Sequence, residues 1–320
     1  MDLLKRNNVL HINPVTEGIG IHITEQGSDW LWAAFAIFTV FFLTHGFLYA
    51  SPTFKHDVVK KNLLLVPFFT NLVLAIAYYT YAANLGYASQ EAEFKHVTTG
   101  DGNFVRQIFY TKYIGWFVAW PAAMMAISIA TSTLSETLTN EAHQNFAGVV
   151  SAFSSFVVKV GAAWVFVLGL LIGSLIHSSY KWGYFVFSAV AQLFGIFLVL
   201  KNLAASARAS QYSKIAAVFI VFQVVVWLLY PICWALSEGG NVVQPDSEAV
   251  FYGILDLCTF SFVPTVLTWI NISIMDDEFF QKLIPFSHGH LAEKLAHSPR
   301  HSGDTAVPLL EPLSSGQEQV

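Results

Sequence analysis

Charged side chains are scarce in this sequence. Asp, Glu, Lys and Arg make up 12% of its 320 residues, about half the share found in a soluble globular domain. Hydrophobic residues make up 55%, so lipid rather than water is the expected surrounding of most of the chain. The formal net charge of −5 at pH 7 is small for this length and argues against a nucleic-acid partner.

Cysteines are also few, and we expect no cleavable leader sequence. Cys233 and Cys258 both fall in apolar stretches, where we expect reduced, buried thiols. The first 28 residues contain no continuous apolar segment of the kind that a cleavable signal peptide needs. The first long apolar run, 30–50, is therefore expected to remain in the protein as a membrane anchor.

Long apolar runs are abundant. A helix needs about 20 apolar residues to cross the hydrocarbon core of a bilayer, and lipid leaves no partner for unpaired backbone groups. Seven runs meet this length, and they cover 30–50, 63–86, 107–130, 152–176, 182–200, 215–236 and 249–272. The sequence predicts an all-α, multi-pass fold, a seven-transmembrane helix bundle.

The lysines and arginines between these runs predict the orientation. If the N-terminus lies outside, nine of them fall in cytoplasmic regions and five in outer regions, which favours an N-out/C-in topology. We expect an extracellular N-terminal segment over 1–28 and a seven-helix membrane domain over 29–275. The stretch 276–320, rich in Ser, Pro, His and Gly, is expected to be a disordered cytoplasmic tail.

Three ionisable side chains fall inside the predicted spans, namely Lys112, Lys159 and Asp256. Each costs about 2.5–3.5 kcal/mol at the membrane centre, so each needs a physical reason. Lys112 and Asp256 both lie toward the outer side in the predicted topology. They are close enough to pair, either as a structural ion pair or in transport, and the alternative is that Lys112 snorkels to the interface. Lys159 lies near the cytoplasmic start of its span, and we expect it to snorkel to the interface.

Three of the predicted helices have an organised inner face. Residues at helical spacing are Lys112, Gly115, Trp116, Ala119 and Ala123 in the third run, Trp227, Tyr230, Pro231 and Trp234 in the sixth, and Asp256, Phe260, Val263 and Leu267 in the seventh. Such stripes usually reflect packing, but the nearby acid and proline favour a pocket wall. The prolines at 121, 231 and 264 should loosen their helices where neighbours satisfy the freed carbonyls.

These residues resemble a known family. The segment 226–268, VWLLYPICWALSEGGNVVQPDSEAVFYGILDLCTFSFVPTVLT, and the segment KYIGWFVAWP are similar to helices of the microbial rhodopsins, and the resemblance extends over 29–275. It implies that the sixth-run aromatic set corresponds to retinal-pocket residues. It also implies that Glu238 and Glu248 correspond to proton-releasing acids and Asp256 to a counter-ion.

The departures from the rhodopsin pattern exclude its chemistry. Phe260 stands where the retinal lysine is expected, Gly115 replaces the proton acceptor, Ala126 replaces the proton donor, and Lys112 replaces an arginine. We therefore expect no cofactor, no metal and no catalytic residue. What remains is a vestigial pocket made of Lys112, Gly115, Trp116, Trp227, Tyr230, Pro231, Trp234, Asp256 and Phe260.

Other segments resemble a fungal branch of the family. HITEQGSDWLW, RQIFYTKYIGWF, SSYKWGYF and the tail segment SPRHSGDTAV are similar to fungal opsin-related proteins without the lysine, which include heat-shock-induced plasma-membrane proteins of yeasts. The resemblance implies a plasma-membrane location, a role in the stress response, and negative regulation of the plasma-membrane proton ATPase as partner. The sequence leaves the oligomeric state open.

Two other functions fit the same residues. A light-independent ion channel or transporter would use Lys112, Asp256, Glu238 and Glu248 along its outer half. A non-covalent binder of an apolar ligand would use the pocket enclosed by aromatic side chains, although Phe260 is expected to fill that space by dense packing. An enzyme is not expected, because the sequence shows no nucleophile–base pair, metal-ligand spacing or Gly-rich phosphate loop.

Overall fold

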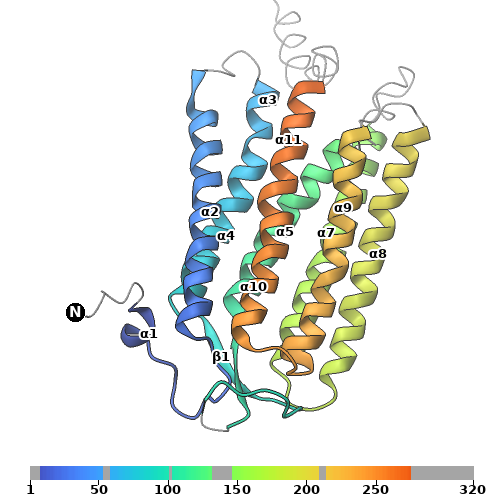
Figure 1. The fold of residues 1–320 in the computed structure, drawn as a ribbon. Coiled ribbons are helices and arrows are strands. Elements are labelled where there is room, and N and C mark those ends of the chain that lie inside the picture. Colours follow the sequence, from blue (N-terminus) through green and yellow to red (C-terminus); the bar gives the residue numbers. More distant parts are fainter. Residues whose placement is uncertain (1–7, 53–57, 101–102, 132–145, 209–213, 275–320) are drawn as a thin grey trace, which may run out of the picture. The chain divides into compact units, whose positions relative to one another are not determined.

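The computed structural model describes residues 8–52, 58–100, 103–131, 146–208 and 214–274. Within these residues, seven helices are long and apolar enough to cross a membrane (Figure 1). The seven spans are Glu25–Ala50, Lys60–Ala82, Tyr110–Ala130, Phe153–Ser174, Lys181–Ala207, Lys214–Gly239 and Pro245–Ile272. The predicted seven-helix bundle is confirmed.

The spans are built from α-helices with two π-helical turns. The elements are α1 Val9–Ile12, α2 Glu25–Ala50, α3 Val58–Leu63, α4 Leu65–Ala82, β1 Tyr87–Glu91, β2 Val105–Phe109, α5 Tyr110–Ala130, α7 Phe146–Ser174, α8 Lys181–Arg208, α9 Lys214–Trp234, η3 Ala235–Gly239, α10 Pro245–Asp256, η4 Leu257–Phe262 and α11 Val263–Ile274. The π-helical turn η3 continues the sixth span after α9. The π-helical turn η4 lies in the seventh span between α10 and α11. Such turns often mark functional sites in helices.

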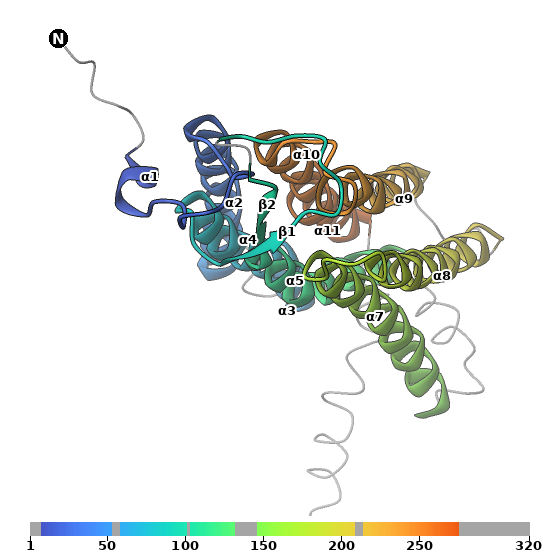
Figure 2. The same cartoon turned by 90° about the horizontal axis from the view of Figure 1, so that it is seen from below.

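The helices follow one another around the bundle. Seen along the helix axes (Figure 2), α2, α4, α5, α7, α8 and α9 succeed each other, and α10 returns to contact α2. We call the end of the bundle with α1 and the two strands the outer end, in keeping with the predicted orientation. The predicted tail 276–320 lies outside the described residues.

A short hairpin and the N-terminal segment cover the outer end. Strands β1 and β2 pair antiparallel, and Ile21 adds a parallel bridge to Arg106. Thr24 caps α2 by accepting from the N–H of Gln26, and its own N–H donates to Asp246 at the start of α10 over 2.8 Å. The segment before the first span is thus tied to the last span, although the two lie 222 residues apart.

The hairpin corrects two predicted helix boundaries. The third span was predicted from residue 107, but β2 occupies Val105–Phe109 and α5 begins at Tyr110. The second span was predicted to reach residue 86, but α4 ends at Ala82. Asn84 and Gly86 then take positive φ angles of 56° and 70°, a backbone conformation that a helix cannot contain and that starts the hairpin.

The prolines at positions 121, 231 and 264, which the sequence predicts to loosen their helices, lie inside the third, sixth and seventh spans. Each lacks an N–H, which frees the carbonyl four residues earlier. Every freed carbonyl accepts a hydrogen bond from a neighbouring helix, the donor–acceptor pairs being Trp164 Nε1 with Phe117 O at 2.9 Å, Gln192 Nε2 with Trp227 O at 2.5 Å, and Thr70 Oγ1 with Phe260 O at 2.8 Å. We call these bonds the proline braces, and they confirm the prediction that neighbours satisfy the freed groups.

Candidate functional site

Four charged side chains meet near the outer end, and we call them the outer ion cluster. They are Arg106 of β2, Lys112 of α5, Glu238 of η3 and Glu248 of α10, and none is more than 7% exposed. Lys112 Nζ lies 2.9 Å from Glu238 Oε1 and also pairs with Glu248 Oε1, while Arg106 Nη2 lies 2.6 Å from Glu248 Oε2. Two cations therefore balance two carboxylates inside the protein.

Neutral groups complete the cluster. Tyr113 and Ser174 donate hydroxyl hydrogen bonds to Glu238 Oε2, the second over 2.7 Å. Arg106 Nη1 donates to Asn241 Oδ1 over 2.7 Å. A buried ion pair offsets its desolvation only when further hydrogen bonds satisfy the charges, and this cluster meets that condition.

The predicted pair between Lys112 and Asp256 is wrong. Lys112 is the third residue of α5, about 3 Å along the axis, and Glu248 is the fourth residue of α10, at a similar depth. Asp256 ends α10, about 16 Å along that axis. The seventh span begins at Pro245 rather than at 249, and this places Asp256 too deep to meet the ammonium of Lys112.

Asp256 instead accepts three hydrogen bonds from neutral side chains. Tyr78 Oη and Trp116 Nε1 donate to Oδ2 over 2.7 Å and 2.9 Å, and Tyr230 Oη donates to Oδ1 over 2.7 Å. The three donors come from α4, α5 and α9, and Asp256 is fully buried. Such donors stabilise a carboxylate where no cation touches it.

Phe260 fills the centre of the bundle. It is fully buried in η4, and its ring centroid lies 5.4 Å from that of Trp120. Trp120 also contacts Trp227 and Tyr230, with centroids 5.9 Å and 5.7 Å away. The cavity beside Trp120 and Trp227 measures about 10 Å³, which is room for one water molecule at most.

Gly115 leaves no room for a proton acceptor. A Cβ atom at this position would lie 2.8 Å from the Cβ of Ala77 on α4, closer than real Cβ atoms approach. An aspartate at 115 would therefore require α4 to move away from α5. Ala126, at the predicted donor position, is buried and apolar. With Phe260 in place of a lysine and the ring of Trp120 against it, these residues do not fit retinal.

The remaining predicted pocket residues lie at different depths. Trp234 belongs to the outer end, since its Nε1 donates to Ser174 over 2.7 Å and its ring stacks on Phe185 of α8. Trp227 is buried beside the ring of Trp120. Pro231 is half-buried and faces a groove between α8 and α9. The structure therefore separates the nine predicted residues into an outer group, a central group and one residue on the flank.

Lys159 does not snorkel. Its side chain is 2% exposed, and Nζ lies 3.4 Å from Ser128 Oγ in the last turn of α5. The C-terminus of a helix carries a partial negative charge and favours a cation. The lysine therefore lies against the end of α5 rather than reaching outward.

Several residues of the site carry no clear signal in the sequence. Arg106 is one of the five basic residues that the sequence predicts in outer regions, but it lies in β2 and its side chain is buried in the bundle. Tyr78, Tyr113 and Trp120 are aromatic residues among many, and only their neighbours give them a role. In the part of the chain that the structure describes, no three His, Cys, Asp or Glu side chains gather in a way that would hold a metal ion.

Residues 28–270 match the family described as bacteriorhodopsin-like protein. The chain belongs to this family. The chain is similar to the 30 kDa heat shock protein of Saccharomyces cerevisiae, with 36% identity over 97% of this chain and 95% of the yeast protein. It is also similar to the opsin-like protein carO of Fusarium fujikuroi, with 31% identity over 83% of this chain and 81% of that protein.

Solved structures show the shared bacteriorhodopsin-like fold. The light-driven proton pump of Coccomyxa subellipsoidea superposes with a TM-score of 0.62 at 24% identity, over 80% of this chain and 99% of the pump. A light-driven proton pump of Leptosphaeria maculans gives 0.62 at 20% identity, over 79% and 98%. This protein is therefore an opsin-like membrane protein related to heat-shock-associated yeast proteins.

Proposed function

We propose that this bacteriorhodopsin-like protein acts in the stress response as a negative regulator of the plasma-membrane proton ATPase, without light and without retinal. The 36% sequence identity with a yeast protein named for heat shock supports the role in the stress response. The ATPase as target comes from the sequence resemblance to the fungal branch of the family. The plasma membrane is the location that this role requires.

The filled interior is the observation that most supports this proposal. Phe260 and Trp120 occupy the centre of the bundle, so the chain keeps the fold without room for the cofactor that drives its relatives. A bundle without internal chemistry acts through its surfaces. Binding to another membrane protein is a function that such surfaces can serve.

The experiment measures ATP-driven proton export in cells exposed to heat or weak acid, with and without this protein. We expect higher export in cells that lack the protein, and a return to the lower level when the gene is restored. Unstressed cells serve as the control, because regulation under stress predicts a smaller difference there. Equal export with and without the protein under stress would contradict the proposal.

A second experiment tests the partner directly. Affinity purification from stressed cells, followed by identification of bound membrane proteins, should recover the proton ATPase with this protein. A second multi-pass protein of similar abundance, tagged in the same way, controls for non-specific membrane association. Recovery of the ATPase in equal amounts with both baits would remove the support for direct binding.

The two alternatives find less support in the geometry. A channel through the outer half would pass the outer ion cluster, whose four charged side chains pair with each other. An apolar ligand in the aromatic pocket would need the space that Phe260 and Trp120 occupy. Among the described residues, no contact inside the bundle supports either the channel or the binder of an apolar ligand.

A further inference from the structure

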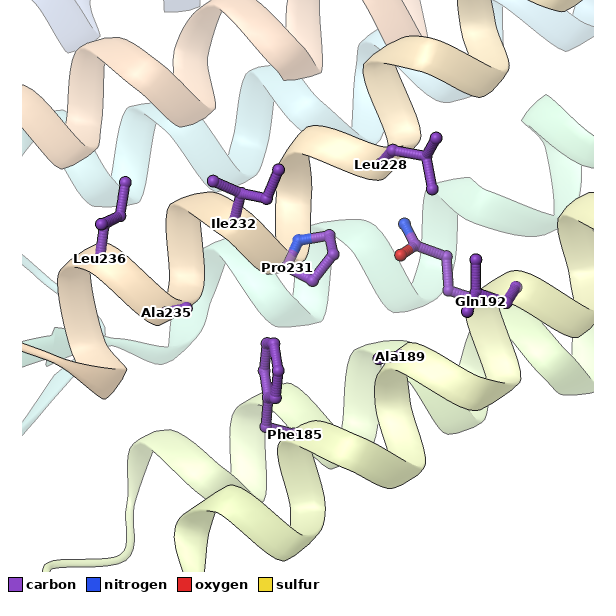
Figure 3. A pocket seen from close by; sticks show the side chains of 9 residues that line it. Phe185, Ala189, Gln192, Leu228, Pro231, Ile232, Ala235 and Leu236 are labelled. Atoms are coloured by element: carbon purple, nitrogen blue, oxygen red, sulfur yellow. The ribbon is translucent and has the colours of Figure 1, made fainter.

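A groove runs along the flank of the bundle between α8 and α9 (Figure 3). It has a volume of about 280 Å³, and its lining includes Phe185, Ala189 and Gln192 of α8 together with Pro231 of α9 and Ala235 of η3. Both helices belong to membrane spans. The groove therefore opens to hydrocarbon rather than to water.

Small side chains and one engaged amide make this groove. Ala189 and Ala235 leave space that larger side chains would fill. The ring of Pro231 lies between them (Figure 3). Gln192 is the one polar side chain of the lining, and its Nε2 donates to the carbonyl of Trp227 over 2.5 Å. The wall that faces the bilayer is accordingly apolar.

The dimensions of the groove select its occupant. From Phe185 to Leu193 the lining covers eight residue steps of α8, or about 12 Å along the helix axis. A volume of about 280 Å³ over this length gives a cross-section of about 23 Å². A helix with its side chains, about 10–12 Å wide, needs roughly four times that area. A single hydrocarbon chain, whose carbons keep a contact distance of about 4 Å, needs roughly 13 Å², so the groove has room for one chain and not for two.

The groove lies at the depth of the outer leaflet of the bilayer. Phe185 lies four residues inside α8, and Leu193 lies twelve, so the groove extends from about 6 to about 18 Å below the start of the helix. Half of the hydrocarbon core is about 15 Å thick. The groove runs parallel to the acyl chains of the outer leaflet and covers most of their depth.

We propose that the α8–α9 groove is a binding site for one acyl chain of an outer-leaflet phospholipid. The chain fills the space between Ala189 and Ala235 and lies against the ring of Pro231. This site is separate from the filled centre around Phe260 and Trp120, because Gln192 and Trp227 close the wall between them. It does not depend on the proposed regulatory role.

Native mass spectrometry of the purified, delipidated full-length protein tests the site with phosphatidylcholine as the probe. Wild-type protein should retain one dioleoyl phosphatidylcholine per chain and should not retain the dihexanoyl form, whose chains are too short to fill the groove. Ala189→Trp should lose the bound lipid by placing an indole in the groove. Val190→Trp is the matched control, since Val190 is adjacent, 60% exposed and outside the lining, and it should retain the lipid.

The melting temperature of each variant shows whether it is folded. Ala189→Leu fills less of the groove than the tryptophan and should weaken lipid retention at least tenfold. Three results would overturn the proposal. They are a wild-type protein that retains no lipid, equal retention by wild type and both Ala189 variants, or a wild-type dimer that Ala189→Trp dissociates. The last result would assign the groove to a second copy of the chain.

Discussion

At the residue scale, Phe260 places a ring in the centre of the bundle at the position where the rhodopsin pattern has an amine. The ring contacts Trp120, and its backbone carbonyl is held by the second span through Thr70. One side chain thus removes the attachment point for retinal and fills part of its space. Trp120 fills more, so restoring a lysine at 260 alone would leave a blocked site.

Dense packing around Phe260 predicts a large loss of stability on truncation. Phe260→Ala should lower the free energy of unfolding by about 3 kcal/mol, the low end for a buried Phe→Ala, because the unfolded span still lies in hydrocarbon. Phe262→Ala, in the same π-helical turn but 47% exposed, should change it by less than about 1 kcal/mol. Denaturant titration in detergent micelles measures the free energy of unfolding of both variants. Equal losses would indicate that position 260 borders a pre-existing cavity.

Lys112 balances two buried carboxylates, so its loss should be costly. Lys112→Met leaves Glu238 without a cation and Glu248 with Arg106 alone, and we expect a loss of about 3–5 kcal/mol in the free energy of unfolding. Adding Glu238→Gln should recover part of that loss by removing the uncompensated charge. Lys214→Met, at an exposed lysine, is the control and should change stability little.

A double-mutant cycle on Lys112 and Glu238 gives their coupling energy. A coupling energy near zero would show that the two charges act independently and would contradict the outer ion cluster as a unit.

Single residues also show where sequence reasoning reaches its limit. The cost of ionisable groups in lipid singled out Lys112, Lys159 and Asp256. It did not identify their partners, and it predicted Lys159 at the interface rather than against the end of α5. The partner of Lys112 depends on the depth at which two helices begin, and Pro245 starts the seventh span one turn earlier than its apolar run. The burial of Arg106 depends on the pairing of β1 with β2, two strands that are separated by a loop. Such choices are fixed by three-dimensional packing rather than by local composition.

At the element scale, the proline braces connect helix geometry to helix packing. A proline in a membrane helix leaves a carbonyl that lipid cannot satisfy. Each brace provides a donor from a neighbouring helix, so the distortion of one helix is stabilised by its contact with the next. Apolar periodicity and proline positions predicted the distortions and their satisfaction. The donors Trp164, Gln192 and Thr70 could not be predicted, because their helices face the prolines only in the folded bundle.

The brace at Pro231 can be tested by a second cycle. Gln192→Leu should lower the free energy of unfolding by about 0.5–1.5 kcal/mol, the typical value of a hydrogen bond between membrane helices. In a Pro231→Ala background the same substitution should have little effect, because the N–H of the new alanine can bind the carbonyl of Trp227. An undiminished effect of Gln192→Leu in that background would show that Gln192 acts through packing and not through the carbonyl.

The hairpin shows why one helix boundary was misplaced. Ile108 and Phe109 continue the apolar run of α5 without a break, so composition alone extends the helix to residue 107. Pairing with β1 draws these residues into a strand, and both remain buried. The apolar run correctly predicted burial. It did not predict the conformation, which depends on the strand twenty residues earlier.

At the scale of the whole molecule, the bundle is closed toward the outside by paired charges and filled at its centre by aromatic rings. The outer ion cluster joins β2, α5, η3 and α10, and the central rings join α5, α9 and η4. The chain therefore keeps the bacteriorhodopsin-like fold with a filled centre.

This arrangement predicts that the protein conducts no ions. Purified protein in planar bilayers should give no current under voltage clamp, in the dark or in the light, above that of protein-free membranes. A retinal-binding proton pump reconstituted at the same density provides the positive control in light. A reproducible current that Lys112→Met alters would favour the channel hypothesis over the regulator.

The proline braces also have a consequence for synthesis, in which the spans enter the membrane in order from the N-terminus. The donors for the carbonyls of Trp227 and Phe260, on α8 and α4, are already inserted when the sixth and seventh spans arrive. The carbonyl of Phe117 waits for Trp164, one span later. A nascent chain that stops after three spans therefore holds an unsatisfied carbonyl in lipid, and we expect insertion chaperones to engage the chain at this length.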